Sequence, residues 1–370
     1  MIYLDAAATS FQKPASVRRA VLDAMTHATS PGRGAHPTAA RAAAAVYACR
    51  DRAARLFSVP EPERVVFTMN ATHGLNIAIR TLVRPWDPVV ISGYEHNAVT
   101  RPLHALGAKL RVASGRLFDP DAVLEDFRKR LPGAKCAVAT HVSNVFGFVL
   151  PVREIAALCR AQGVPLIVDA SQSAGVLDVD VSALGAAFVA MPGHKGLLGP
   201  QGTGLLLCGT EPEPLIFGGT GSQSLEQTMP DDLPDRLEAG THNVPGIAGL
   251  DEGIRYVAPR MTAIRAQERA LTAELAERLR GCEDLEVFYS GGEAQTGVLS
   301  VRSARQNCEM LAETLAENGV AVRAGLHCAP LAHRSAGTLE TGTVRLSLSP
   351  FTTQREIERV AALFQRITRQ

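Results

Sequence analysis

The 370-residue chain has few lysines and no excess of charge of either sign. Its 38 basic and 37 acidic residues leave a formal net charge of +1, which argues against nucleic acid or an anionic membrane as the main partner. No apolar run is long enough to span a bilayer. The N-terminal segment carries an acid at Asp5 and lacks the basic region of a signal peptide. We therefore expect a cytoplasmic protein, in which thiols stay reduced.

Paired cysteines are also lacking. The chain has seven cysteines, an odd number, and no CxxC pair, so the sequence indicates neither a disulfide framework nor a zinc site. Cys328 stands apart because it follows His327 in a glycine-containing loop, GLHCAP. Four others fall in apolar strand or helix patterns, where cysteine behaves as a small hydrophobic residue; these are Cys136, Cys159, Cys208 and Cys308.

Apolar runs rich in valine and isoleucine alternate with helical patterns over the first two thirds of the chain. The helical patterns include residues 72–82 and 152–163. This alternation predicts an α/β fold, with a parallel sheet covered on both faces and ligands bound beyond the carboxyl ends of its strands. The predicted strands are residues 64–68, 88–92, 136–142, 165–169 and 187–191.

The pattern changes near residue 255, and a chain of this length is expected to form two domains. Residues 258–281 are predicted to form one long helix and residues 307–319 another. A final helix has an apolar stripe at helical spacing, made of Ile357, Val360, Ala361, Phe364 and Ile367. Strands are predicted at residues 285–290, 297–303, 320–325 and 343–349. This mixture predicts a second, smaller α+β domain.

Lys195 is the one lysine of five that the pattern places at a ligand site. It follows an apolar strand within a glycine-rich turn, at the end of a parallel sheet where ligands bind. A tight loop with an incidental lysine would have the same spacing. The other four lysines precede a proline, lie in a charged run or flank strand starts, so we expect them to be solvated; they are Lys13, Lys109, Lys129 and Lys135.

Asp169 is the last residue of the predicted apolar strand 165–169. The next predicted strand, 187–191, is the one that Lys195 follows. A carboxylate at the end of a buried strand needs a partner, unless it is the N-cap of a helix. A lysine that forms a Schiff base, opposed by an aspartate at a pyridine nitrogen, is typical of pyridoxal phosphate (PLP) sites. A helix that opens near Thr72 could bind the phosphate at its N-terminus, although threonine is also an ordinary N-cap. Together these residues favour a PLP enzyme.

The chain resembles the class V (fold-type I) PLP enzymes and, among them, the SUF-type cysteine desulfurases and selenocysteine lyases. The resemblance implies a fold-type I PLP-transferase whose large domain, residues 15–258, holds a mostly parallel seven-stranded sheet between helices. A smaller α+β domain, residues 259–370, would carry the cysteine loop, and an arm, residues 1–14, would pack against it. The matching motifs are YLDAAATSFQKP (3–14), RGAH (33–36), NATHGLN (70–76), EHNA (95–98), HVSNVFG (141–147), VDASQSAG (168–175), GHKGLLGPQGTG (193–204), RLEAGTHN (236–243), RAGLHCAP (323–330) and VRLSLSPFTT (344–353).

The resemblance also implies how PLP would be held. Lys195 would form the Schiff base and Asp169 would pair with the ring nitrogen. His96 would stack on the ring and help to move protons, with a polar surface histidine as the alternative. The other implied contacts are Gln172 and Asn144 near the phenolic oxygen, Ala71, Thr72 and His194 at the phosphate, and Thr241 at the phosphate of the other subunit.

Substrate contacts follow from the same resemblance. Arg345 would bind the carboxylate of L-cysteine as a bidentate fork, with a structural ion pair as the alternative. Cys328 would attack the substrate sulfur and form a persulfide, leaving L-alanine, in a cationic setting made by His327, Arg323 and Arg345 that lowers its pKa. Asn144 would lie near the substrate, and His36 would lie on a segment that approaches the partner's site. The enzyme would be a homodimer with shared active sites and would pass sulfur to an acceptor protein.

Three positions depart from the family pattern: Ala6 replaces an asparagine, Pro192 replaces a common serine, and Leu326 replaces a histidine. Pro192 removes a hydroxyl and an N–H from the phosphate site. Four alternatives to a cysteine desulfurase stay open on the sequence. They are a selenocysteine lyase, a cysteine-conjugate β-lyase, a class V aminotransferase that does not need Cys328, and a non-catalytic sulfur-carrier or scaffold protein.

Overall fold

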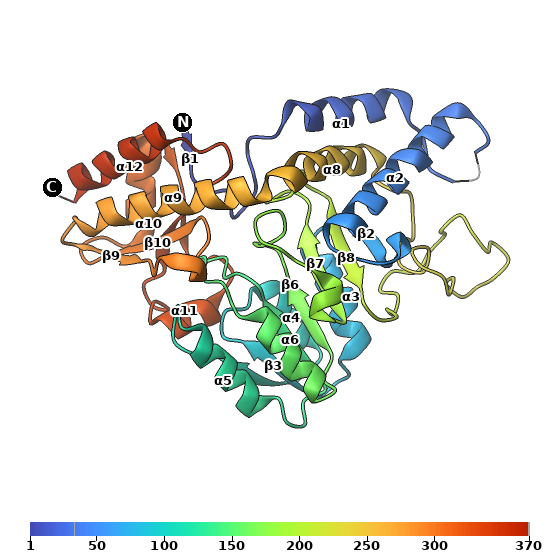
Figure 1. The fold of residues 1–370 in the computed structure, drawn as a ribbon, viewed down its shortest axis with the longest axis horizontal. Coiled ribbons are helices and arrows are strands. Elements are labelled where there is room, and N and C mark those ends of the chain that lie inside the picture. Colours follow the sequence, from blue (N-terminus) through green and yellow to red (C-terminus); the bar gives the residue numbers. More distant parts are fainter. Residues whose placement is uncertain (33, 369–370) are drawn as a thin grey trace.

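The computed structural model describes residues 1–32 and 34–368. Three sheets organise this part of the chain: one of seven strands, one of four and one of two. Figure 1 shows the seven-stranded sheet and its helices at one end of the molecule and the C-terminal elements at the other, with helices α8 (Val244–Val257) and α9 (Met261–Arg280) following one another from the first end to the second.

The seven-stranded sheet has the strand order β2-β8-β7-β6-β5-β3-β4. Strand β8 runs antiparallel to both of its neighbours, whereas all the other neighbours pair in parallel. The predicted α/β class and the mostly parallel seven-stranded sheet are therefore confirmed. The strands are β2 (Val65–Thr68), β3 (Pro88–Ser92), β4 (Lys109–Ala113), β5 (Cys136–Thr140), β6 (Leu166–Asp169), β7 (Phe188–Pro192) and β8 (Gly204–Cys208).

Helices cover both faces of this sheet because successive residues of a strand point to opposite sides. In β3, Val90 packs in a core with α2, α5, α6 and α8, whereas Val89 and Ile91 pack on the other face with α3 and α4. This two-sided burial explains why the strands are almost continuously apolar. The helices are α1 (Ala15–His27), α2 (Pro37–Leu56), α3 (Ala71–Leu82), α4 (Asn97–Ala105), α5 (Pro120–Arg130), α6 (Val152–Ala161), α7 (Val181–Leu184) and α8 (Val244–Val257), with a 3-10 turn η1 (Pro62–Arg64).

The C-terminal part is built on the four-stranded antiparallel sheet, in the order β12-β13-β10-β9. Its separate core includes the apolar stripe of α12, whose five predicted residues are all buried. The elements are η2 (Ala258–Arg260), α9 (Met261–Arg280), β9 (Leu285–Phe288), η3 (Gly292–Ala294), β10 (Val298–Ser303), α10 (Cys308–Glu317), β11 (Val320–Ala321), β12 (Arg323–Gly325), α11 (Pro330–Ala336), β13 (Thr343–Ser347) and α12 (Gln354–Ile367).

Two predicted elements are wrong in their extent. Residues 258–281 do not form one uninterrupted α-helix, because the 3-10 turn η2 contains Pro259, which has no N–H to donate, and α9 begins at Met261. The predicted strand 320–325 is two strands that belong to different sheets. β11 pairs with the N-terminal strand β1 (Ile2–Tyr3), and β12 pairs with β13.

The N-terminal arm connects the C-terminal part to the loop that carries Lys195. Ile2 and Leu4 are buried in the C-terminal core. Further along, the backbone N–H of Ser10 donates to the His194 carbonyl at 2.9 Å. The arm is therefore held by the C-terminal core near its start and by the Lys195 loop near its end. The domain boundaries at residues 14 and 258 stay predictions.

Candidate active site

A cavity lies at the carboxyl ends of β5, β6 and β7. This is where an open parallel sheet binds ligands. It brings together eight of the predicted site residues: Ala71, Thr72, His96, Asn144, Asp169, Gln172, His194 and Lys195. The lining also includes Asn70, Thr140 and Ser171, which the sequence analysis did not assign.

Lys195 lies in the glycine-rich loop that joins β7 to β8. The loop closes on itself through the N–H of Gly193, which donates to the Thr203 carbonyl at 2.8 Å. A side chain at Gly193 would clash, since its Cβ would lie 2.2 Å from Thr203 Oγ1. Burial of the ammonium group lowers the pKa of Lys195 to about 8, although the negative charge of Asp169 opposes the shift. A substantial fraction of the amine is thus neutral near pH 8, as imine formation and proton transfer require.

Asp169 is the last residue of β6 and lies on the strand next to β7. Its Oδ1 accepts a 2.9 Å hydrogen bond from the Ser171 N–H. Residues 170–174 form a turn rather than a helix, so the N-cap alternative is wrong. The buried carboxylate is available to a protonated ring nitrogen in the cavity.

The N-terminus of α3 forms another wall of the cavity. The N-cap Asn70 accepts a 2.9 Å hydrogen bond from the His73 N–H through its side chain. Among the described residues, no partner is found for the N–H groups of Ala71 and Thr72. Free N–H groups at a helix N-terminus attract an anion, so this wall suits a phosphate.

The two cavity histidines are both held neutral. His96 is the N-cap of α4, and its Nδ1 accepts a 3.0 Å hydrogen bond from the Ala98 N–H, which places the proton of the neutral ring on Nε2. Burial lowers the pKa of His96. Burial also lowers the pKa of His194 to about 4, and the Nδ1 of that ring lies 3.0 Å from Thr9 Oγ1.

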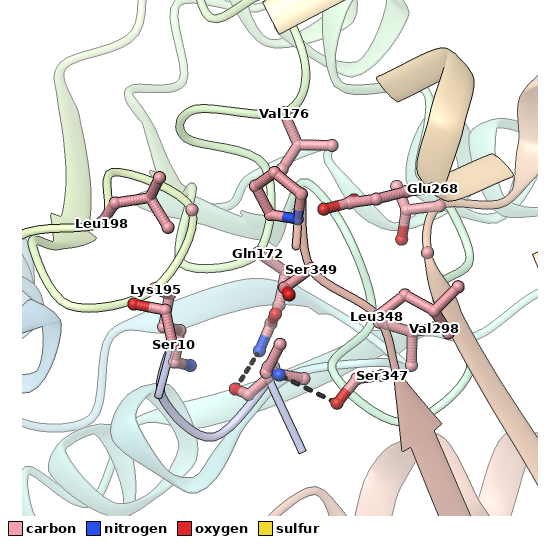
Figure 2. A pocket seen from close by; sticks show the side chains of 16 residues that line it. Ser10, Gln172, Val176, Lys195, Leu198, Glu268, Val298, Ser347, Leu348 and Ser349 are labelled. Carbon is pink, nitrogen blue, oxygen red and sulfur yellow. Dashed lines mark hydrogen bonds between the residues drawn. The ribbon is translucent and has the colours of Figure 1, made fainter. Parts of the chain in front are cut away.

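A second cavity adjoins the first, between the N-terminal arm and helix α9 (Figure 2). Gln172 and Lys195 border both cavities. The side-chain amide of Gln172 donates to the Ala7 carbonyl at 3.0 Å, and the Ala7 N–H donates to Ser347 Oγ at 2.9 Å. The arm therefore orients Gln172. The buried carboxyl group of Glu268 also lines this second cavity.

Arg345 occupies the middle of β13 with its side chain 2% exposed. Its Nη2 donates to Asp5 Oδ1 at 2.7 Å and its Nη1 donates to the Asn144 carbonyl at 2.9 Å. The ion-pair alternative left open by the sequence is thus the arrangement in this structure. No site role was predicted for Asp5 from the sequence. The available signal was an acid that follows apolar residues near the N-terminus, within a family motif.

Cys328 is exposed and lies between β12 and α11. His327 and Cys328 both adopt left-handed backbone conformations, with φ of 50° and 56°, which non-glycine residues disfavour. Two hydrogen bonds to their backbone carbonyls help to hold these residues. The Asn144 side chain donates to the His327 carbonyl at 2.8 Å, and the Asn97 N–H donates to the Cys328 carbonyl at 2.7 Å. Since Asn97 follows His96, which lines the first cavity, the backbone of Cys328 is attached to a residue next to that cavity.

The prediction that His327 adds positive charge beside Cys328 is wrong. Its ring is buried, its Nε2 lies 3.2 Å from the Thr343 carbonyl, and it stacks on His333. Burial lowers the pKa of His327 to about 2, so the ring is neutral. Positive charge near the loop comes from Arg323 and Arg345 instead.

Thr241 and His36 lie away from the first cavity. Thr241 is exposed and borders a separate cavity with His73 and Glu238. His36 is exposed and caps α2, and Arg33 of the same motif lies outside the described residues. Their roles across a subunit interface stay predictions.

Two kinds of feature are absent from residues 1–32 and 34–368. No group of three or more His, Cys, Asp or Glu side chains is arranged to hold a metal ion. No helix in these residues is long and apolar enough to cross a membrane.

Comparison with known proteins gives matches along nearly the whole chain. The family model described as aminotransferase class-V matches residues 2–360. A probable cysteine desulfurase of Methanothermobacter thermautotrophicus is 35% identical over 99% of this chain and 94% of its own length. A cysteine desulfurase of Klebsiella pneumoniae is 34% identical over 99% of this chain and 93% of its own. The apo structure of a cysteine desulfurase from Thermococcus onnurineus superposes with a TM-score of 0.90 at 30% identity, covering 100% of this chain and 94% of that one.

Proposed function

The chain belongs to the class-V aminotransferase family, and from this premise we propose that it is a PLP-dependent cysteine desulfurase. It converts L-cysteine to L-alanine and transfers the sulfur to Cys328. The observation that carries the proposal is the arrangement around one cavity, where Lys195 and Asp169 face a shared space and the exposed Cys328 loop is attached to its wall through Asn144.

The donor set of the cavity fits PLP. The α3 N-terminus, with Ala71 and Thr72, suits the phosphate. Asp169 suits a protonated pyridine nitrogen, and Lys195 suits the aldehyde carbon. When bound, the cofactor supplies an electron sink for the negative charge that develops at the substrate Cα. Pro192 at the end of β7 has no N–H to give the phosphate, so the helix N-terminus and His194 carry that interaction.

The residues of the chain perform the remaining steps. Arg345 binds the substrate carboxylate through Nε, the guanidinium nitrogen that neither Asn144 nor Asp5 occupies. The neutral Nζ of Lys195, favoured by its pKa of about 8, takes the proton from the substrate Cα. The Cys328 thiolate then attacks the substrate sulfur, so that an S–S bond forms as the Cβ–S bond breaks. The electron pair left on Cβ takes up a proton, and Lys195 Nζ returns a proton to Cα, which completes L-alanine.

The wider setting is part of the same proposal. Thr241 and His36 are exposed and do not line the first cavity of their own chain, which supports a homodimer in which each reaches the partner's site. The exposure of Cys328 supports delivery of sulfur to an acceptor protein. The seven free thiols support a cytoplasmic location.

The test is a product assay on the purified protein supplied with PLP and L-cysteine. L-alanine should form in step with sulfide in the presence of a reductant, and Cys328 should gain one sulfur atom by mass spectrometry without it. Lys195→Ala should lose the visible absorption of the bound cofactor. A wild-type protein that stays colourless after PLP is added would sink the cofactor assignment. Unchanged turnover in Cys328→Ser would sink the role of the thiol.

The same assay separates the alternatives. A selenocysteine lyase would release selenide from L-selenocysteine and leave L-cysteine almost unused. A cysteine-conjugate β-lyase would release a thiol and pyruvate. An aminotransferase would keep its activity in Cys328→Ser, and a sulfur carrier or scaffold would bind no cofactor.

A further inference from the structure

Asp5 forms ion pairs with two arginines, one of which, Arg345, is hydrogen-bonded to the cavity residue Asn144. Its Oδ1 lies 2.7 Å from Arg345 Nη2 and its Oδ2 lies 3.5 Å from Arg323 Nε. The Arg345 side chain is 2% exposed and the Asp5 side chain 16% exposed, whereas the Arg323 side chain is 50% exposed. The first ion pair is therefore largely shielded from water and the second is not.

The backbone fixes Asp5 in this position. Asp5 forms a β-bridge with Ser347, and the Ala6 N–H donates to the Ser347 carbonyl at 3.2 Å. The Tyr3 hydroxyl donates to the Asp5 carbonyl at 3.1 Å. These contacts attach the arm to β13, the strand that carries Arg345, so the carboxylate and the guanidinium are held on adjacent backbone.

Arg345 keeps one guanidinium nitrogen free for a ligand. Nη1 and Nη2 are committed to Asn144 and Asp5, whereas Nε is buried and has no partner among the described residues. A buried N–H without a partner is costly, and a carboxylate entering beside Asn144 would satisfy it. The side chains of Arg323, Arg345 and Asp5 have a net charge of +1. One ligand carboxylate would balance that charge.

We propose that Asp5 is a specificity-determining residue that neutralises one of the two guanidinium charges, so that the site favours an amino acid with a single carboxylate over one with a second acidic group. The inference rests on the proposed function for the class of substrate. Its physical basis is that a fixed negative charge in a poorly solvated site repels a further anion far more than in bulk water.

The experiment compares two ligands that have nearly the same size and differ in one charge. Dissociation constants of L-aspartate and L-asparagine are measured by calorimetric titration of the purified, PLP-loaded protein, and the ratio of the two constants is the readout. In Asp5→Asn, which keeps an oxygen to accept from Arg345, the affinity for L-aspartate relative to L-asparagine should rise by roughly tenfold. In Arg323→Ala the affinity for L-aspartate relative to L-asparagine should fall. The double variant Asp5→Asn/Arg323→Ala restores the charge count and should return to the wild-type ratio.

Each outcome decides the inference. An unchanged ratio in folded Asp5→Asn, or a double variant that equals Asp5→Asn alone, would overturn it. Thermal unfolding shows whether Asp5→Asn folds, and if it does not, the direction in Arg323→Ala decides alone. The ratio needs no turnover, so a protein that binds these ligands in the expected ratios but makes no L-alanine from L-cysteine would refute the proposed function and leave this inference intact.

Discussion

Asn144 joins Arg345 to the cysteine loop: its backbone carbonyl accepts a hydrogen bond from Arg345 Nη1 at 2.9 Å, and its side-chain amide donates to the His327 carbonyl at 2.8 Å. One residue thereby contacts both the group proposed to bind the substrate carboxylate and the loop that carries the nucleophile. His327 and Cys328, both left-handed, depend on such contacts to keep a conformation that costs about 1–3 kcal/mol per residue.

We expect Asn144→Ala to free the cysteine loop. The loss of the amide donor removes one of the two hydrogen bonds to the carbonyls of His327 and Cys328, so the Cys328 thiol should react with iodoacetamide several times faster, measured by mass spectrometry of the modified peptide. Sulfur transfer from L-cysteine should fall by at least about tenfold, because the thiol is less often correctly placed.

Asn97→Ala is the matched control for that experiment. Asn97 holds the loop through its backbone N–H, which donates to the Cys328 carbonyl, so truncation of its side chain leaves this bond in place. Alkylation of Cys328 should stay close to the wild-type rate. Equal acceleration in both variants would contradict a specific role for the Asn144 amide.

The seven cysteines should separate sharply in a thiol titration of the native protein. All seven are free, six are buried and Cys328 is exposed. Burial also raises the pKa of Cys159 to about 12 and that of Cys308 to about 11, so few of these thiols are in the reactive thiolate form. Ellman's reagent should modify one thiol quickly, and Cys328→Ser should abolish that fast phase. Two or more fast thiols in the native protein would contradict the burial of the others.

Local patterns predicted much of the fold, because apolar runs report directly on burial. The predicted strand 88–92 coincides with β3, and the stripe of the last helix is buried as expected. The division of residues 320–325 between two sheets could not be predicted in this way. It depends on β1, which arrives from the far end of the chain to pair with Val320 and Ala321, and local patterns do not report on such distant pairing.

The candidate site shows the same limit. Lys195 and Asp169 could be found because each follows an apolar strand of one sheet, which brings the strand ends together. The contacts of Asp5 and Asn144 could not, because they join residues far apart in sequence through specific side-chain directions. The charge of His327 was predicted wrongly for a related reason: its burial against Thr343 and His333 is a tertiary feature.

Glu238→Gln should destabilise the fold. Both carboxylate oxygens of Glu238 accept from Arg50, at 2.9 and 2.7 Å, and the Phe67 N–H donates to the same carboxylate at 2.7 Å. Both partners of the ion pair are almost fully buried. Neutralising Glu238 leaves the Arg50 guanidinium buried without a counter-charge, which should lower the free energy of unfolding by about 3 kcal/mol, measured by urea denaturation.

An exposed ion pair is the comparison for that measurement. Glu125 pairs with Arg128 on the surface of α5, where both side chains are about half exposed, and such pairs contribute little to stability. Glu125→Gln should therefore unfold at nearly the wild-type urea concentration. If Glu238→Gln did the same, the buried pair would not stabilise the fold as described.

Glu268 should make the stability of the protein fall as the pH rises. Burial raises the pKa of its carboxyl group from 4.5 to about 8. Between these values the unfolded chain has lost the proton that the folded protein still binds, so the free energy of unfolding decreases with pH across this range. The substituted side chain in Glu268→Gln cannot ionise, so the free energy of unfolding of this variant relative to the wild type should increase by about 2 kcal/mol from pH 6 to pH 8.

Urea denaturation at several pH values measures this difference. The control is Glu277→Gln, which removes an exposed carboxyl on the same helix and should keep the pH dependence of the wild type. Parallel pH profiles for wild type and Glu268→Gln would show instead that Glu268 ionises in the folded protein as readily as in the unfolded chain, and that the second cavity admits enough water to solvate its charge.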